Sequence, residues 1–216
     1  MHYLTDLWHA LDFGSMGKMA MRAAAVLVCL TVHETCHALA AYALGDPTAK
    51  RQHRLSLNPL HHIDWLGLAM LMLAGFGWAK PVPVNPYFFK KPKSGMALTA
   101  LAGPVSNFLL ALLALVALRF FLPVLGGSSL LNQFLLECAV LSIGLGVFNL
   151  IPIPPLDGSK VLGALLPDRQ YEMLLRYEHL GILVLWALLL VGVGGELMDG
   201  AIVSIFDLFC RIVGLF

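Results

Sequence analysis

Three long apolar runs restrict what this chain can fold into. They cover residues 19–44, 96–122 and 130–150, and each reaches the roughly 20 residues that an α-helix needs to cross a bilayer core. Only 12% of the 216 residues are charged, whereas soluble domains average about 25%, and the mean hydropathy is +0.81. The chain is therefore predicted to be an all-α multi-pass membrane protein built as a helical bundle.

The rest of the chain divides around this bundle. Apolar side chains recur at helical spacing among polar ones in residues 1–17, which favours an interfacial N-terminal segment. Residues 18–166 form the predicted membrane core, and 167–216 hold the C-terminal helices. Apolar stretches at about 179–193 and 200–216 leave the number of spanning helices at four to six.

A mixed segment separates the first two long runs. Its apolar piece, residues 66–78, is too short to span comfortably, so we expect a short re-entrant or interfacial element there. The following residues 80–86 alternate as in a strand, but their prolines cannot donate to a β-ladder. This part is predicted to be a β-like edge strand or an extended loop.

The basic residues indicate an orientation. Residues 45–95 carry most of them, whereas the 119–130 loop carries only Arg119. Cytoplasmic loops of membrane proteins carry an excess of Lys and Arg, so we place 45–95 on the cytoplasmic side. The net charge of +1 gives no reason to expect a nucleic-acid partner.

The first apolar run contains the pattern His33-Glu34-Thr35-Cys36-His37. Positions i and i+4 share one face of a helix, so both imidazoles can reach one metal ion, while Glu34 lies beside it as a base. An ionisable residue inside a membrane is costly and therefore indicates a functional site. A catalytic zinc usually takes three protein ligands, so the sequence must supply one more.

Asp157 is the candidate third ligand. It follows a spanning run and a proline-rich break, and Gly158 comes directly after it. Taken alone, Asp157 is about equally well explained as a helix N-cap. The weaker rivals for the ligand position are Glu137, Asp64, His62 and Asp207.

These patterns together resemble the site-2 protease family of intramembrane zinc metalloproteases. The resemblance covers about residues 25–165 and is carried by His33-Glu34-x-x-His37, Gly45-Asp46-Pro47, Leu57-Asn58-Pro59, residues 77–86, Ala102-Gly103-Pro104-x-Ser106-Asn107, and Asn149-x-x-Pro152-x-Pro154-x-x-Asp157-Gly158. Many relatives contain PDZ or CBS domains, and this chain has room for neither. It is similar to the compact branch of the family.

The resemblance implies one Zn²⁺ per chain, held by His33, His37 and Asp157, with Glu34 as the general base that acts on zinc-activated water. It implies that Asn149 and Asn107 assist the substrate or the geometry of the site. The implied reaction is hydrolysis of peptide bonds in or near transmembrane segments of membrane proteins. The implied location is a prokaryotic inner membrane, with the active site inside the bilayer nearer the cytoplasmic face.

The residues also suggest how the substrate is held. A transmembrane helix must unwind before water can attack it, and the edge of residues 80–86 could pair with the extended chain. We name Val82 and Val84 as candidate clamp residues, with a plain proline-rich connector as the alternative. An oxyanion role for Asn149 competes with an interhelical hydrogen bond.

Other functions use similar residues. A zinc transporter also places histidines and carboxylates in helices, but it should carry them along several helices. A haem carrier needs axial histidines, and two on one helix face cannot bracket a haem. A catalytically inactive membrane scaffold is a further alternative, although every catalytic position of the motif is filled.

Overall fold

The computed structural model describes residues 16–67, 79–191 and 195–215. Its α-helices and 3-10 helices (η) in chain order are α2 (Met16–Ala43), α3 (Thr48–Arg51), η1 (Pro59–His61), η2 (Pro86–Phe88), α5 (Pro92–Leu125), α6 (Leu130–Asn149), α7 (Asp157–Leu165), α8 (Asp168–Arg176), α9 (Glu178–Val191) and α10 (Gly195–Val213). The predicted interfacial segment, residues 1–17, lies almost wholly outside the described residues. So does most of the predicted re-entrant piece.

The structure confirms an all-α membrane protein. Within the described ranges, α2, α5 and α6 are long and apolar enough to cross a membrane. Residues 1–15, 68–78 and 192–194 lie outside these ranges, so the total of four to six spans stays a prediction. α9 covers the 14 residues Glu178–Val191 next to one of these gaps, and α10 carries charges at both ends. At about 1.5 Å per residue, the 34 residues of α5 extend about 51 Å, well beyond one bilayer core.

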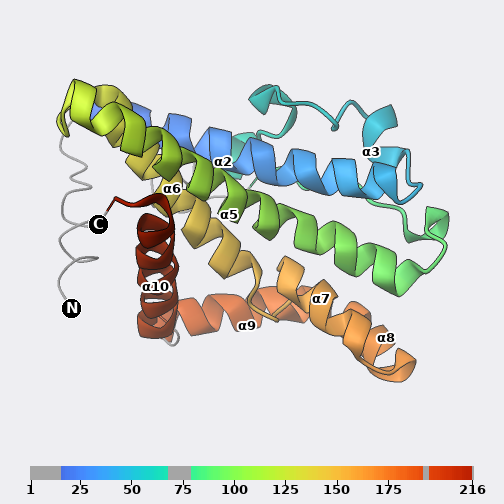
Figure 1. Cartoon of the computed structure of the whole chain (residues 1–216). Helices are drawn as coiled ribbons and strands as arrows, with labels where there is room; N and C mark the ends of the chain where they lie inside the picture. Colours follow the sequence, from blue (N-terminus) through green and yellow to red (C-terminus); the bar gives the residue numbers. More distant parts are fainter. Residues whose placement is uncertain (1–15, 68–78, 192–194, 216) are drawn as a thin grey trace.

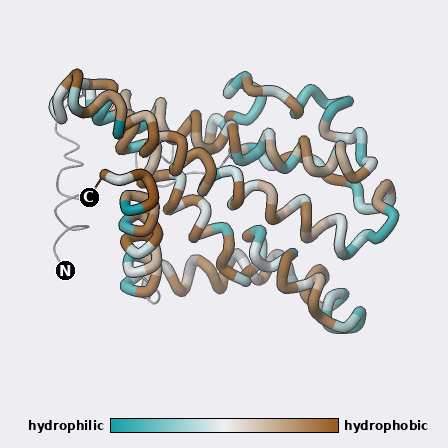
Figure 2. Tube along the Cα trace, viewed as in Figure 1, coloured by the Kyte–Doolittle hydropathy of each residue, from teal (hydrophilic) through white to brown (hydrophobic). Residues whose placement is uncertain are grey.

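α5 is the centre of the bundle and contacts α2, α6 and α7 (Figure 1). Small buried residues such as Ala25, Ala111 and Ala139 let these helices approach closely. Leu109, Leu113 and Phe120 lie on α5 and are more than half exposed. Figure 2 shows the hydrophobic character continuing along α5 and α6, with hydrophilic residues gathered around α3 and the start of α5. Apolar side chains on the outside suit a lipid environment.

The ends of α5 differ from the sequence prediction. We expected residues 96–122 to be helical and Pro123 to lie in the connecting loop, but α5 runs from Pro92 to Leu125 and contains both Pro104 and Pro123. Pro92 begins α5, and proline suits the first position of a helix. Pro123 lies in the last turn of α5, where the missing proline N–H removes only one hydrogen bond, so it does not stop the helix. α5 ends at Leu125, and Gly126 follows as the C-cap with a φ of +76°.

Residues 80–85 form an extended segment that is anchored at both ends. The Lys80 N–H donates to the His62 carbonyl at 2.9 Å, and the Asn85 N–H donates to Asp46 Oδ2 at 2.7 Å. Among the described residues the predicted β-like character is limited to one antiparallel bridge, between Ile63 and Ala79. The prolines that follow cannot extend this ladder because they have no N–H group.

Asp46 connects the turn after α2 to this segment, so its loss should weaken the fold. It is fully buried and accepts hydrogen bonds from the N–H groups of Thr48 and Asn85. Asp46→Ala should lower the free energy of unfolding by roughly 2 kcal/mol, because it leaves two part-buried N–H donors without an acceptor. Asp46→Asn keeps one acceptor oxygen and should fall in between. Denaturant unfolding in detergent measures both, and an unchanged Asp46→Ala midpoint would contradict this role.

Candidate metal centre

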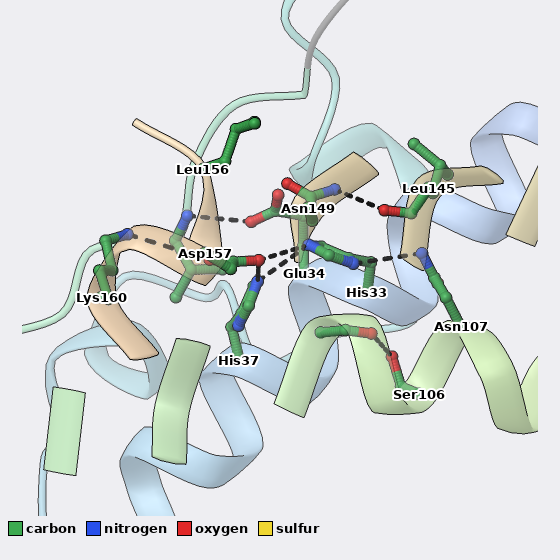
Figure 3. A network of polar contacts seen from close by, with 12 residues as sticks. His33, Glu34, His37, Ser106, Asn107, Leu145, Asn149, Leu156, Asp157 and Lys160 are labelled. Carbon is green, nitrogen blue, oxygen red and sulfur yellow. Dashed lines mark hydrogen bonds and ion pairs between the residues drawn. The ribbon is translucent and has the colours of Figure 1, made fainter. Parts of the chain in front are cut away.

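His33 and His37 lie one turn apart within α2 and point toward the centre of the bundle (Figure 3). Their Nε2 atoms are 2.9 Å apart, and the two rings meet edge to face with centroids 4.5 Å apart. Both side chains are buried. The i, i+4 spacing in the sequence therefore brings both imidazoles to one point, as predicted.

Asp157 reaches the same point from the first residue of α7. Its Oδ2 lies 3.2 Å from His33 Nε2 and 3.1 Å from His37 Nε2. The N-cap explanation does not describe this geometry, because Leu156 occupies the cap position. The chain doubles back tightly here: a Cβ on Gly158 would lie 2.2 Å from the Leu150 carbonyl oxygen, so a residue with a side chain would clash.

The three ligand atoms lie within 4.8 Å of one another and could hold one metal ion. Asp157 Oδ2 is buried without a hydrogen-bond partner. Burial by itself raises the pKa of the Asp157 carboxyl, but the adjacent imidazoles outweigh burial and hold that pKa well below its usual range. An anionic oxygen facing two ring nitrogens is a donor set that suits Zn²⁺.

Helix α5 supplies the other side of this cluster. The Thr99 carbonyl lies 2.7 Å from His37 Nδ1, and Asn107 Nδ2 lies 3.2 Å from His33 Nδ1. Between them, a Cβ on Gly103 would lie 2.5 Å from the His37 ring and 2.6 Å from His33 Cε1. The spacing of four residues puts Thr99, Gly103 and Asn107 on one face of α5, against both histidines.

Sequence reasoning missed part of this face. Asn107 and Gly103 stand in the quoted motif, but nothing in the sequence pairs them with particular histidines. Thr99 contributes a backbone carbonyl, which every residue carries, so no sequence signal could have found it.

Glu34 lies next to His33 and faces the extended segment. Its Oε2 accepts a hydrogen bond from the Val82 N–H at 3.1 Å. Arg54, which is also buried, donates from Nη2 to the Lys80 carbonyl in the same segment. Burial lowers the pKa of the Arg54 guanidinium, and the Glu34 carboxylate opposes that shift. The segment that holds Val82 therefore lies against the candidate base.

The remaining candidates are placed as follows. Asn149 donates from Nδ2 to the Leu145 carbonyl of its own helix at 3.0 Å, and Lys160 Nζ lies 4.0 Å from Asp157 Oδ1. Of the rival ligands, His62 Nε2 lies 2.7 Å from the Ser56 carbonyl and Asp64 accepts from the Leu66 and Gly67 N–H groups. In the described part of the chain, only His33, His37 and Asp157 form a potential metal-binding group.

A membrane helix bundle with a buried cluster of two histidines and one carboxylate defines a membrane-embedded metalloprotein. The family model described as "Peptidase family M50" matches residues 127–192. The protein named "Putative zinc metalloprotease YwhC" from Bacillus subtilis is 40% identical over 183 residues, covering 80% of this chain and 81% of that protein. The chain belongs to peptidase family M50, the site-2 protease family, and is a zinc metalloprotease.

Other relatives agree with this family. The protein named "Putative zinc metalloprotease Rip2" from Mycobacterium tuberculosis is 32% identical over 199 residues, which covers 89% of this chain and 75% of that protein. "Zinc metalloprotease MJ0392" from Methanocaldococcus jannaschii is 35% identical over 80 residues, which covers 37% of this chain and 22% of that protein. No solved structure matches the chain.

Because α5 leaves no room beside the histidines, Gly103→Ala should disturb the cluster. Its Cβ would force both rings away from their positions, so we expect zinc affinity to fall about tenfold or more, measured by chelator competition in detergent. Gly144→Ala is the matched control, since its Cβ would meet only Ile202 at 3.9 Å. Wild-type affinity in Gly103→Ala would show that this contact does not shape the site.

Proposed function

We propose that this zinc metalloprotease is an intramembrane endopeptidase that cuts membrane proteins in or near their transmembrane segments. One observation carries the proposal: His33 and His37 are buried within α2, a helix long and apolar enough to span a membrane. A hydrolytic site built on such a helix meets its substrate at membrane depth. Placing an ionisable side chain at membrane depth costs free energy, so such a residue indicates a functional site.

His33, His37 and Asp157 hold the zinc ion in this proposal. A zinc ion held by these residues would supply Lewis-acid chemistry, which would polarise the scissile carbonyl and lower the pKa of water toward neutral. Helix α2 carries the two imidazoles, and the first residue of α7 carries the carboxylate. Lys160 adds a positive charge near the other oxygen of Asp157.

Glu34 is the proposed general base. It takes a proton from the attacking water and returns it to the leaving amine, so the water adds across the peptide bond with no net change in protons. The Val82 N–H holds Oε2 at 3.1 Å, which leaves the other carboxylate oxygen to act on water. Asn149 is the proposed oxyanion donor, because one amide N–H bonds to Leu145 and an amide carries two.

The extended segment of residues 80–85 is the proposed substrate clamp. It passes Glu34 at Val82 and is fixed at its ends by Lys80 and Asn85. A fixed edge next to the base can hold an unwound substrate by backbone pairing. Val82 and Val84 then contact the substrate on either side of Pro83.

A prokaryotic inner membrane is the proposed location, with the site nearer the cytoplasmic face. The Lys and Arg bias of residues 45–95 supports this orientation. The relatives named above come from bacteria and an archaeon. The partners in this proposal are the lipid bilayer and a membrane-protein substrate.

The metal and base roles separate in two variants. Asp157→Ala should lose most of the roughly one zinc per chain expected in wild type, whereas Glu34→Gln should keep zinc and lose cleavage by about a thousandfold. Mass spectrometry gives the zinc content, and fragments released from tagged single-span proteins in proteoliposomes give cleavage. Wild-type zinc in Asp157→Ala would refute the ligand set, and cuts confined to soluble loops would refute the intramembrane proposal.

The clamp is tested at Val82. Val82→Pro removes the N–H that Glu34 accepts, so cleavage should fall at least tenfold while zinc affinity stays at the wild-type value. Val82→Ala keeps that N–H and should be less affected, and Val84→Ala reports the second contact. If all three variants cut a tagged single-span substrate at the wild-type rate, residues 80–86 are only a connector.

A further inference from the structure

The side-chain oxygen of Asn107 is one of the buried polar atoms around the histidines that have no hydrogen-bond partner. Asn107 is fully buried, and its Oδ1 makes no hydrogen bond, while its Nδ2 faces His33 Nδ1 at 3.2 Å. An unsatisfied buried amide oxygen costs free energy, typically about 1–3 kcal/mol. A buried orphan of this kind, next to a side chain at the metal centre, calls for a physical explanation.

The donor set of the centre supplies one. His33 points its Nε2 at Asp157 Oδ2, so in the ligand role proposed above Nε2 offers its lone pair to the metal. A neutral imidazole then carries its proton on Nδ1. An N–H group on His33 would face the NH₂ group of Asn107, and two donors cannot bond to each other.

Rotating the Asn107 amide by 180° removes the conflict between the two donors and gives the amide oxygen a partner, while the NH₂ group takes the place where the oxygen stood. Amide oxygen and nitrogen have nearly the same size and are assigned from the hydrogen bonds around them. We propose that the Asn107 carboxamide oxygen accepts a hydrogen bond from His33 Nδ1–H, which makes Asn107 a positioning residue that directs His33 Nε2 to the metal. This inference rests on the proposed zinc site.

His37 already shows the same arrangement in this structure. Its Nδ1 lies 2.7 Å from the Thr99 carbonyl oxygen, which can only accept. His33 and His37 are four residues apart on α2, and Asn107 and Thr99 are eight apart on the facing helix α5. In this proposal His37 donates from Nδ1 to the backbone carbonyl of Thr99, and His33 donates from Nδ1 to the side-chain carbonyl of Asn107, two turns farther along α5.

The position of Asn107 also distinguishes it from a substrate contact. It has no exposed surface, and Figure 3 shows it on the opposite side of His33 from Asp157. A substrate could not reach its amide without displacing the ring. Of the two roles that the resemblance implies for Asn107, we therefore assign it to the geometry of the site.

Three variants test this assignment in purified full-length protein. Asn107→Asp supplies acceptor oxygens only, Asn107→Leu has a similar volume and no acceptor, and Ser106→Ala removes a neighbouring hydroxyl that bonds only to the Gly103 carbonyl of its own helix. Zinc affinity is measured by chelator competition. The absorption spectrum of the Co²⁺-substituted protein reports ligand geometry, and circular dichroism checks folding.

We expect Asn107→Asp and Ser106→Ala to bind zinc within about threefold of wild type. Asn107→Leu should bind zinc 10- to 100-fold more weakly, as for the loss of other groups that orient metal ligands, with an altered Co²⁺ spectrum. Wild-type affinity and spectrum in Asn107→Leu would overturn the proposal. So would a loss of tenfold or more in Asn107→Asp, since the amide N–H would then be the working group.

If Asn107→Leu does not fold, Asn107→Asp still tests the proposal, because a loss of tenfold or more in that variant would overturn it. Failure of the zinc site itself is recognised separately. In that case Asp157→Ala would bind zinc as tightly as wild type, whereas failure of the present proposal leaves Asp157→Ala defective and the Asn107 variants contradicting expectation.

Discussion

The convergence of three lone-pair donors inside a helix bundle is the constraint on which the rest of this structure depends. His33, His37 and Asp157 bring two ring nitrogens and a carboxylate oxygen to one buried point. Electron-rich atoms placed together away from water repel one another, and a cation relieves that repulsion. A metal ion bound by these three residues would therefore stabilise the folded chain. The helices around the cluster hold it together and satisfy the outer edges of its imidazoles.

Two close backbone approaches make the convergence possible. Gly103 lets α5 lie directly against both rings, and Gly158 lets the chain double back under the end of α6 so that Asp157 enters the bundle. A side chain at Gly103 would occupy space filled by the two histidine rings, and one at Gly158 would occupy space filled by the backbone of Leu150. Close approach has a functional use, because it puts the Thr99 carbonyl within hydrogen-bond distance of His37.

Two buried charged residues also hold residues 80–85, the segment that passes the candidate base Glu34. Asp46 and Arg54 come from the region after α2, and each bonds to the backbone of residues 80–85. Buried charges are retained only where hydrogen bonds compensate their loss of water. Asp46 and Arg54 bond to main-chain groups of residues 80–85, so these contacts hold the backbone of the segment and do not involve its side chains. The Val82 N–H in this segment donates to Glu34, and that contact does not depend on the Val82 side chain.

The sequence by itself determined the helical membrane class through its long apolar runs, and it paired the two histidines through their i, i+4 spacing within one helix. It named Asp157 as a candidate ligand because this residue follows a spanning run and a proline-rich break. It also indicated the family through residues 25–165. Only the tertiary structure decided that Asp157 meets both imidazoles and that α5 continues past Pro123. It also decided that Thr99, Gly103 and Asn107 line the α5 side of the candidate metal centre. Those contacts depend on the pairing of helices far apart in the chain, and a backbone carbonyl such as that of Thr99 leaves no signature in the identity of a residue.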